Sequence, residues 1–182
     1  MRLFLVRHGV TASNLERRFT GQSDVPLSVL GERQARAAAA ALAGTPLDMV
    51  VSSDLRRAWA TAEVISRPHG LTPEADPDLR EICMGVWEGR AASEIEAEDL
   101  ELITNWRKDP VRYAPPGGES LEGLRARLVG ALARWQGRFP RGTLLWVTHG
   151  GSIGTLLCHL LGMDPTRREQ FRRDNAAITE LE

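Results

Sequence analysis

Three short apolar runs mark the chain, and each is followed by a small or polar turn and then by a helix-like segment. The runs are residues 3–6 (LFLV), 47–51 (LDMVV) and 144–147 (LLWV). Continuous apolar runs rich in branched and aromatic residues are typical of strands buried on both faces of a parallel sheet. The helix-like segments that follow them are residues 10–19, 53–66 and 151–161. This repetition predicts an α/β fold, a three-layer α/β/α sandwich with a mostly parallel central sheet.

Two further segments have helical character. Residues 31–43 contain good helix formers and are followed by Gly44 and Pro46, which stop a helix. Ser120 is a suitable N-cap for a longer helix whose apolar residues recur at helical spacing. Those residues are Leu121, Leu124, Leu128, Leu132, Trp135 and Phe139. We expect this longer helix to cover one face of the sheet.

The middle of the chain lacks a clear strand pattern. Residues 67–90 are loop-like, residues 92–108 favour a helix, and residues 109–119 (DPVRYAPPGGE) contain too much proline and glycine for regular structure. The length of the chain suits one domain with a full hydrophobic core rather than two. We therefore expect a single domain over residues 1–182, in which residues from about 85 to 120 form an insertion that covers the substrate.

Charge and hydropathy narrow the classes of partner. The formal net charge is −1, so no overall positive field attracts nucleic acid, and any site for an anion must be local. No apolar run approaches the roughly 20 residues that a membrane span needs. Residues 1–6 (MRLFLV) are too short for the apolar core of a signal peptide. We expect a cytoplasmic protein that takes a small anionic ligand and binds neither nucleic acid nor a membrane.

The cysteine and histidine spacings do not indicate a metal site. Cys83 and Cys158 are isolated and lack the spacing of a disulfide framework or a zinc knuckle, so reduced thiols are expected. A zinc site built from His149, His159 and Cys158 has no supporting spacing, because His159 lies among leucines as a packed helix residue would. His69, between proline and glycine, has the surroundings of a loop residue. We expect neither a metal ion nor a cofactor.

Charged side chains follow all three predicted strands. The segments are Arg7-His8-Gly9, residues 52–57 (SSDLRR) and residues 148–151 (THGG). In an open parallel sheet, ligands bind beyond the carboxyl ends of the strands. A single histidine in a turn is most often a cap or an exposed residue. Two histidines and at least two arginines at equivalent strand ends, beside glycines and helix N-termini, instead favour an anion pocket.

These segments are similar to the motifs of the histidine phosphatase superfamily, also known as the phosphoglycerate-mutase-like family. The resemblance covers nearly the whole chain, and its four motifs occur in order. They are residues 5–11 (LVRHGVT), which continue through Asn14, Arg18 and Gly21; residues 52–62 (SSDLRRAWATA); residues 79–82 (LREI) with 87–89 (WEG); and residues 148–151 (THGG). Val10 departs from the family, which usually has Glu or Gln there, so the polar contact of that side chain at the pocket edge is in doubt.

The resemblance implies a phosphoglycerate-mutase-like fold and a role for each matching residue. His8 is the nucleophile, and the phosphoryl oxygens are held by Arg7, Arg57 and His149. Guanidinium groups suit this task, because phosphoryl transfer depends mostly on positioning and on stabilising charge. Further phosphate contacts are implied for Asn14, whose alternative role is a helix cap, and for Gly21 and Gly150.

The departing oxygen of a phosphomonoester needs a proton, and the family match makes Glu81 the donor and then the base for water. Glu88 is a second carboxylate nearby, and we expect it to fix the loop rather than to transfer a proton. These two residues are the candidates for acid and base, with Glu81 preferred.

Three functions are compatible with the motifs. The first is a phosphatase that acts on a small phosphorylated metabolite, because residues 115–120 (PPGGES) resemble the loop of small phosphatases, including the α-ribazole phosphatase type. The second is a phosphoglycerate mutase, although the chain lacks the longer insertions of glycolytic mutases. The third is a binding module for phosphoproteins without turnover, which has no need of both a nucleophile and a proton donor. The sequence is compatible with a monomer or a homodimer.

Overall fold

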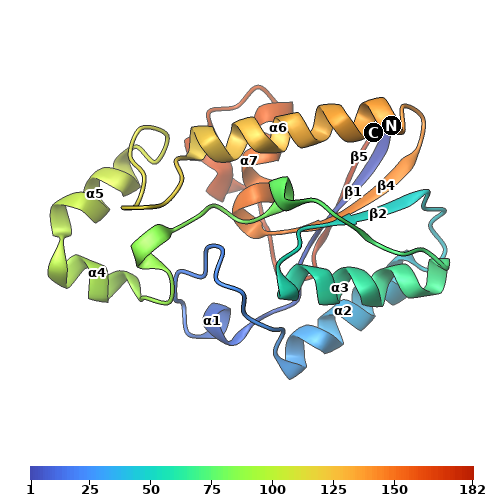
Figure 1. The fold of residues 1–182 in the computed structure, drawn as a ribbon, viewed down its shortest axis with the longest axis horizontal. Coiled ribbons are helices and arrows are strands. Elements are labelled where there is room, and N and C mark those ends of the chain that lie inside the picture. Colours follow the sequence, from blue (N-terminus) through green and yellow to red (C-terminus); the bar gives the residue numbers. More distant parts are fainter.

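The computed structural model describes residues 1–182 as five strands and seven α-helices, joined by loops and short 3₁₀ turns (Figure 1). The strands are β1 (Arg2–Arg7), β2 (Met49–Ser52), β3 (Glu74–Ala75), β4 (Thr143–Thr148) and β5 (Ile178–Leu181). The helices are α1 (Ala12–Leu15), α2 (Val29–Leu42), α3 (Arg56–Ser66), α4 (Ala92–Glu98), α5 (Leu100–Lys108), α6 (Leu121–Arg138) and α7 (Gly150–Leu160). The 3₁₀ turns are Arg67–His69, Pro77–Leu79, Gly85–Trp87 and Pro165–Gln170.

The five strands form one sheet in the order β3-β2-β4-β1-β5. All neighbouring pairs are parallel except β1 with β5, so the predicted mostly parallel sheet is confirmed. The pairing of β1 with β4 runs from Arg2 opposite Thr143 to Arg7 opposite Thr148. Both strands therefore end at the same edge of the sheet, at the level where the first and last sequence motifs leave it.

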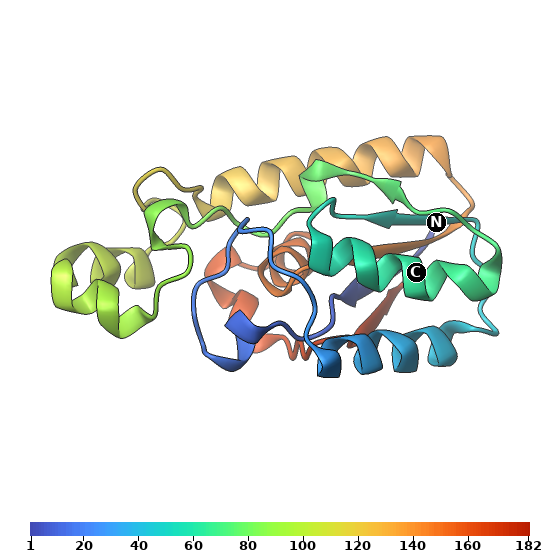
Figure 2. The same cartoon turned by 60° about the horizontal axis from the view of Figure 1, so that its bottom comes forward.

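Two hydrophobic cores lie on opposite faces of the sheet, because successive side chains of a strand point in opposite directions. Leu3 and Leu5 of β1 belong to the core under α6 and α7, whereas Phe4 and Val6 belong to the core under α2 and α3. Figures 1 and 2 show the resulting three layers, with α6 and α7 on one side and α2 and α3 on the other. The predicted α/β/α sandwich is confirmed.

The long helix α6 shows how the sequence pattern produces this layer. Ser120 is its N-cap, and the Ser120 hydroxyl accepts a hydrogen bond from the Gly123 amide at 3.2 Å. The buried residues of α6 are Leu121, Leu124, Leu128, Ala131 and Trp135, which form one stripe at helical spacing. The stripe packs on the sheet, as the sequence indicates.

Several predicted boundaries differ from the structure. The segment over residues 10–19 contains only the single turn α1, because the chain turns at Arg17, whose φ is +55°. Strand β3 lies within the residues expected to be loop, and β5 was not expected at all. The reason is that β3 is two residues long and β5 is an edge strand with alternating burial, so neither forms a continuous apolar run.

The turn after β1 lies directly against the start of α2. A Cβ atom on Gly9 would lie 2.3 Å from the carbonyl oxygen of Gly31, and a Cβ atom on Gly31 would lie 2.2 Å from that of Val10. Only glycine permits this approach of two backbones. Helix α2 therefore supports the loop that carries His8.

The segment between β3 and α6 extends beyond the end of the sheet, where α4 and α5 lie side by side (Figures 1 and 2). It is anchored through an aromatic cluster, in which the ring centroid of Trp106 lies 5.7 Å from that of Phe19 and 5.4 Å from that of Trp87. As expected, residues 109–119 contain turns but no helix or strand. No helix is long and apolar enough to cross a membrane.

Candidate active site

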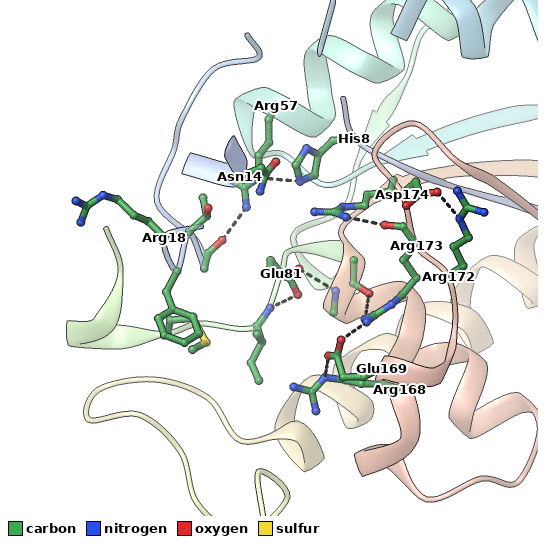
Figure 3. A pocket seen from close by; sticks show the side chains of 18 of the residues that line it. His8, Asn14, Arg18, Arg57, Glu81, Arg168, Glu169, Arg172, Arg173 and Asp174 are labelled. Atoms are coloured by element: carbon green, nitrogen blue, oxygen red, sulfur yellow. Dashed lines mark hydrogen bonds and ion pairs between the residues drawn. The ribbon is translucent and has the colours of Figure 1, made fainter. Parts of the chain in front are cut away.

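A pocket of about 510 Å³ opens at the carboxyl ends of β1 and β4 (Figure 3). Most of the residues that the sequence motifs single out line it. They are Arg7, His8, Asn14, Gly21, Arg57, Glu81 and Gly150. His149 does not line the pocket surface, but its ring packs against that of His8, with centroids 5.0 Å apart.

His8 is buried and held in one tautomer. Its Nδ1 lies 2.7 Å from the carbonyl oxygen of Gly9, which can only accept, so Nδ1 carries the proton. Its Nε2 lies 3.3 Å from Nε of Arg57, which can only donate, so Nε2 keeps a lone pair. Burial, and then the positive charge of Arg57, hold the pKa of His8 well below its ordinary value. The ring is therefore a neutral imidazole whose unprotonated Nε2 accepts from Arg57, and Nε2 can attack once Arg57 turns this donor to a ligand oxygen.

Arg57 connects His8 to the loop that follows α1. Its side chain is buried at the start of α3, and it donates to the carbonyl oxygens of Gly21 at 2.7 Å and Ser23 at 2.8 Å. Burial lowers the pKa of Arg57 from its usual value. Because these partners are carbonyls rather than carboxylates, the positive charge of Arg57 is not cancelled by an ion pair.

Arg7 is the last residue of β1 and directly precedes His8. One terminal nitrogen donates to the carbonyl oxygen of Arg173 at 2.6 Å, whereas Nε is buried without a partner. The guanidinium lies close over Gly150, where a Cβ atom would come within 3.3 Å of Nε. Burial lowers the pKa of Arg7. A buried donor without an acceptor is uncommon and marks a place where a ligand oxygen would be stabilised.

His149 is the N-cap residue of α7 and is completely buried. Its Nε2 lies 2.9 Å from the hydroxyl oxygen of Ser53, and its Nδ1 has no partner. Burial, followed by the positive charge of Arg57, holds the pKa of His149 well below its ordinary value. The segments after β1, β2 and β4 thus meet here, as their positions in the sequence predict.

The two candidate carboxylates have different surroundings. Glu81 lines the pocket, and its carboxylate accepts from the amides of Gly151 and Ile82, each at 2.9 Å. A Cβ atom on Gly151 would lie 2.3 Å from this carboxylate, so the glycine makes room for it. Glu88 lies outside the pocket lining and accepts from three groups of the surrounding loops. They are the Gln22 amide at 2.8 Å, the Ser23 hydroxyl at 2.7 Å and the Met84 amide at 3.1 Å.

Two details of the opening motif differ from expectation. The N-cap of α1 is Thr11, and Asn14 is the third residue of a capping box whose side chain accepts from the Thr11 amide at 3.1 Å. Asn14 also lines the pocket, so it takes part in the cap and faces the ligand space. We expected the Val10 side chain at the pocket edge. Val10 is instead buried and does not line the pocket.

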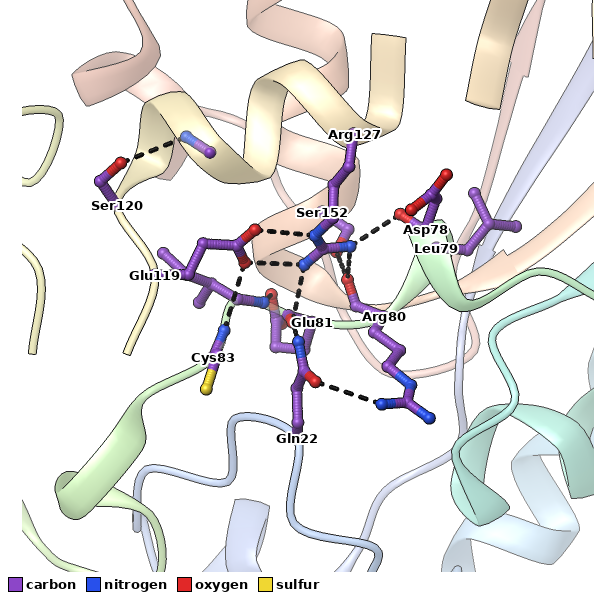
Figure 4. Close-up of polar contacts among 12 residues, drawn as sticks. Gln22, Asp78, Leu79, Arg80, Glu81, Cys83, Glu119, Ser120, Arg127 and Ser152 are labelled. Carbon is purple, nitrogen blue, oxygen red and sulfur yellow. Dashed lines mark hydrogen bonds and ion pairs between the residues drawn. The ribbon is translucent and has the colours of Figure 1, made fainter. Parts of the chain in front are cut away.

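Sequence reasoning missed Arg127, which holds the loop that carries Glu81 (Figure 4). Its guanidinium donates to the carbonyl oxygens of Asp78 and Arg80 at 2.7 Å and of Glu81 at 2.9 Å. It also forms a two-point ion pair with Glu119, at 2.8 and 2.9 Å. The available signal was its spacing, because position 127 falls on the buried face of α6 between Leu124 and Ala131, where an unpaired charge would be unfavourable.

The remaining candidates lie apart from the pocket. Cys83 and Cys158 are free thiols, and neither lines it. His159 lies near Arg125 on α6, at 3.5 Å, and His69 lies in a 3₁₀ turn after α3. No group of three or more histidine, cysteine, aspartate or glutamate residues is arranged to hold a metal ion.

The low pKa values of His8 and His149 predict a stability that falls as the pH drops below about 6.5. In the unfolded chain both rings take up protons there, whereas the folded site keeps them neutral. The loss is at most about 1.4 kcal/mol per pH unit for each histidine. Urea denaturation between pH 7.5 and 5.5 measures it, and His8→Gln should show a smaller loss than the wild type. An equal loss in both proteins would contradict a neutral, buried His8.

Replacing Arg127 should destabilise the fold far more than replacing a neighbouring surface arginine. Arg127→Met removes the donor of three carbonyls and the partner of a mostly buried Glu119, at a cost of about 2–4 kcal/mol. The control is Arg125→Met on the same helix, where the lost partner is the exposed Glu122 and little should change. Urea unfolding curves measure the free energy of unfolding of both variants. Similar midpoints would show that the Arg127 contacts contribute little to stability.

Comparisons with known proteins agree with this geometry. A model of the histidine phosphatase superfamily (branch 1) matches residues 3–182. The probable phosphoglycerate mutase GpmB of Yersinia enterocolitica is 36% identical over 187 residues, which cover 100% of this chain and 85% of the relative. The structure of the α-ribazole phosphatase from Shigella flexneri superposes with a TM-score of 0.93 at 30% identity, over 100% of this chain and 90% of that one.

A mycobacterial glucosyl-3-phosphoglycerate phosphatase is similar to the same degree. Its structure, a complex with VO3, superposes with a TM-score of 0.90 at 35% identity and covers 100% of this chain and 90% of that one. Both of these structures are named as phosphatases, whereas the relative from Yersinia enterocolitica is named as a probable mutase. The predicted family and its fold are confirmed, and the chain belongs to the histidine phosphatase superfamily.

Proposed function

We propose that this protein hydrolyses small phosphomonoesters through a phosphohistidine intermediate on His8. The observation that carries the proposal is the state of His8, a neutral imidazole whose unprotonated Nε2 lies at a pocket lined by the buried Arg57 and the half-buried Arg7. Beside it, Nε of Arg7 and Nδ1 of His149 are buried without a hydrogen-bond partner. A phosphoryl group placed against Nε2 of His8 would bring acceptor oxygens to the guanidinium groups of Arg7 and Arg57, which line the same pocket.

The reaction takes two steps. In the first, Nε2 of His8 attacks phosphorus, the bond from phosphorus to the ester oxygen breaks, and Glu81 gives a proton to the departing oxygen. In the second, Glu81 takes a proton from water as that water attacks the phosphohistidine, which releases phosphate and restores His8. The charge on the transferred oxygens is stabilised throughout by Arg7, Arg57 and His149, with Asn14, Gly21 and Gly150 forming the wall of the phosphate site.

Hydrolysis is preferred to mutase chemistry because water can reach the pocket. A mutase must protect its phosphohistidine from water until the substrate has turned over. Here Arg172 lines the pocket with a side chain that is 89% exposed, so one wall is open to solvent. The insertion over residues from about 85 to 120 contributes Trp106 to the lining. A mutase remains the second candidate, because curated relatives carry that name at 36% identity.

The proposal includes the conditions of the reaction. The guanidinium groups of Arg7 and Arg57, which line the pocket, supply the positive charge that metal ions supply in other phosphoryl-transfer enzymes, so turnover should need no metal or cofactor. We propose a cytoplasmic enzyme that acts on a small phosphorylated metabolite and binds neither nucleic acid nor a membrane. A pocket that only bound phosphoproteins would have no use for the attacking geometry of His8.

The first test is to trap the intermediate in the presence of EDTA. Brief incubation with a phosphomonoester, followed by quenching without acid and mass spectrometry, should find the adduct on His8, and His8→Gln should lose nearly all turnover. In the same buffer, 3-phosphoglycerate should yield free phosphate rather than 2-phosphoglycerate. An adduct on another residue, or complete loss of activity that Mg²⁺ restores, would overturn the mechanism.

The second test concerns Glu81 as the proton donor. General acid catalysis contributes about 10²–10⁴-fold, but only when the departing oxygen needs a proton. Glu81→Gln should therefore lose far more kcat/KM on an alkyl phosphate than on p-nitrophenyl phosphate, whose leaving group departs as a stable anion. The matched variant is Glu88→Gln, because the Glu88 carboxylate contacts only loop residues. This variant should lower kcat/KM by similar factors on the two substrates. If Glu81→Gln lowered kcat/KM by similar factors on both substrates, Glu81 would not be the proton donor.

A further inference from the structure

The pocket carries more positive charge than a phosphoryl group requires. Six arginines and three carboxylates line it, and two of those arginines, Arg7 and Arg57, already match the two charges of a phosphate dianion. The other four are Arg18, Arg168, Arg172 and Arg173. The partners of these four side chains determine whether any of them is available to bind the substrate.

Three of the four have partners elsewhere or lie in solvent. Arg18 pairs with Glu94 at 2.9 Å and donates to the carbonyl oxygen of Gly89 at 3.0 Å. Arg172 is almost fully exposed and pairs with Asp174 at 2.6 Å. Arg173 has its own partners around the start of α7. They are the carbonyl oxygens of Gly150 at 2.8 Å and Phe171 at 3.1 Å, together with the Glu169 carboxylate.

Arg168 differs from the other three. Its side chain is only 13% exposed, and its one ionic contact joins Nε to the Glu169 carboxylate at 3.3 Å. The same carboxylate binds Arg173 more closely, so one negative charge is shared by two guanidinium groups. No group of the protein accepts a hydrogen bond from the two terminal nitrogens of Arg168, although the side chain lines the pocket. These two nitrogens face the pocket, so an anion of the substrate can pair with them without displacing a protein partner.

The fold holds Arg168 in this position. The 3₁₀ segment Pro165–Gln170 lies against α7, and Gly154 permits the contact, because a Cβ atom there would lie 3.0 Å from the carbonyl oxygen of Arg168. Figure 3 shows Arg168 at the end of the pocket away from His8, with Glu81 between them. Burial lowers the pKa of Arg168, and the nearby charge of Glu81 acts in the opposite direction. An anion beyond Glu81 would therefore meet a guanidinium that is already held in place and whose charge is only partly balanced by Glu169.

We propose that Arg168 forms a second anion site, and that the substrate is a phosphomonoester whose leaving group carries an acidic group. This inference rests on the proposed function, because it places the phosphoryl group at His8 and the leaving group on the side of Glu81. The acidic group is a carboxylate or a second phosphate, both of which a guanidinium can bind through two parallel hydrogen bonds. The volume of the pocket, about 510 Å³, is sufficient for both anionic groups and a short linker.

The test compares ligands that differ only in the second acidic group and that cannot be hydrolysed. Calorimetry should show that the wild type binds 3-phosphonopropionate about 10- to 100-fold more tightly than propylphosphonate, the gain expected for charge-assisted hydrogen bonds. Propane-1,3-bisphosphonate tests a phosphate in place of the carboxylate. Arg168→Met should remove most of the preference, and Arg168→Lys should keep part of it.

The matched control is Arg167→Met, which makes the same change of charge one residue away at an exposed position outside the pocket lining and should keep the preference. Absence of any preference in the wild type, or equal weakening of all three ligands in Arg168→Met, would overturn the second site. Because binding needs no turnover, the preference can survive even if phosphate release or the His8 adduct is not found. That result would refute the proposed hydrolysis and leave the second anion site standing.

Discussion

The parallel pairing of β1 with β4 is the contact on which the site depends. In this register Arg7 lies opposite Thr148, and the amide of His8 donates to the Thr148 carbonyl oxygen at 3.0 Å. The next residue of each segment is a histidine, so the pairing brings the rings of His8 and His149 together. A shift of one residue would turn the side chains of a strand to the opposite face and separate this pair from Arg57.

The arginines of the site form hydrogen bonds to neutral groups, so their positive charge stays available to a ligand. Arg57 donates to two carbonyl oxygens and to a neutral imidazole, and Arg7 donates to the carbonyl oxygen of Arg173. A carboxylate in any of these places would compete with a phosphate for the same guanidinium. Carbonyl dipoles fix the orientation of the arginines but leave their charge to be balanced by a ligand. Burial first, and then this positive charge, lower the pKa values of both histidines.

Sequence patterns predicted the parts of the structure that repeat a simple rule. The apolar runs at β1, β2 and β4 are buried on both faces, and the stripe of α6 has the period of a helix. The motif residues were found together because strand ends of a parallel sheet meet at one edge. The two-residue β3 and the edge strand β5 lack that pattern.

The arginines that matter outside the motifs could not be found in this way. Arg168 lies in a 3₁₀ segment next to Arg167, and nothing in the sequence distinguishes the two arginines. What distinguishes the two is packing against α7, which the local sequence does not record. Arg127 gives a weak signal through its place on the buried face of α6, but the three carbonyl oxygens that it binds lie on a loop of irregular backbone.

The strand that carries His8 is completed by the far end of the chain. Its two neighbours in the sheet are residues 143–148 and 178–181, and Asn175 donates to the carbonyl oxygen of His8 at 3.0 Å. On the ribosome, β1 is made before both of these partners, so a nascent chain exposes an apolar strand that has no neighbour to pair with. The site around His8 can therefore form only after residues 143–181 have been made, so synthesis of the β4 and β5 segments sets the time at which the nucleophile becomes usable.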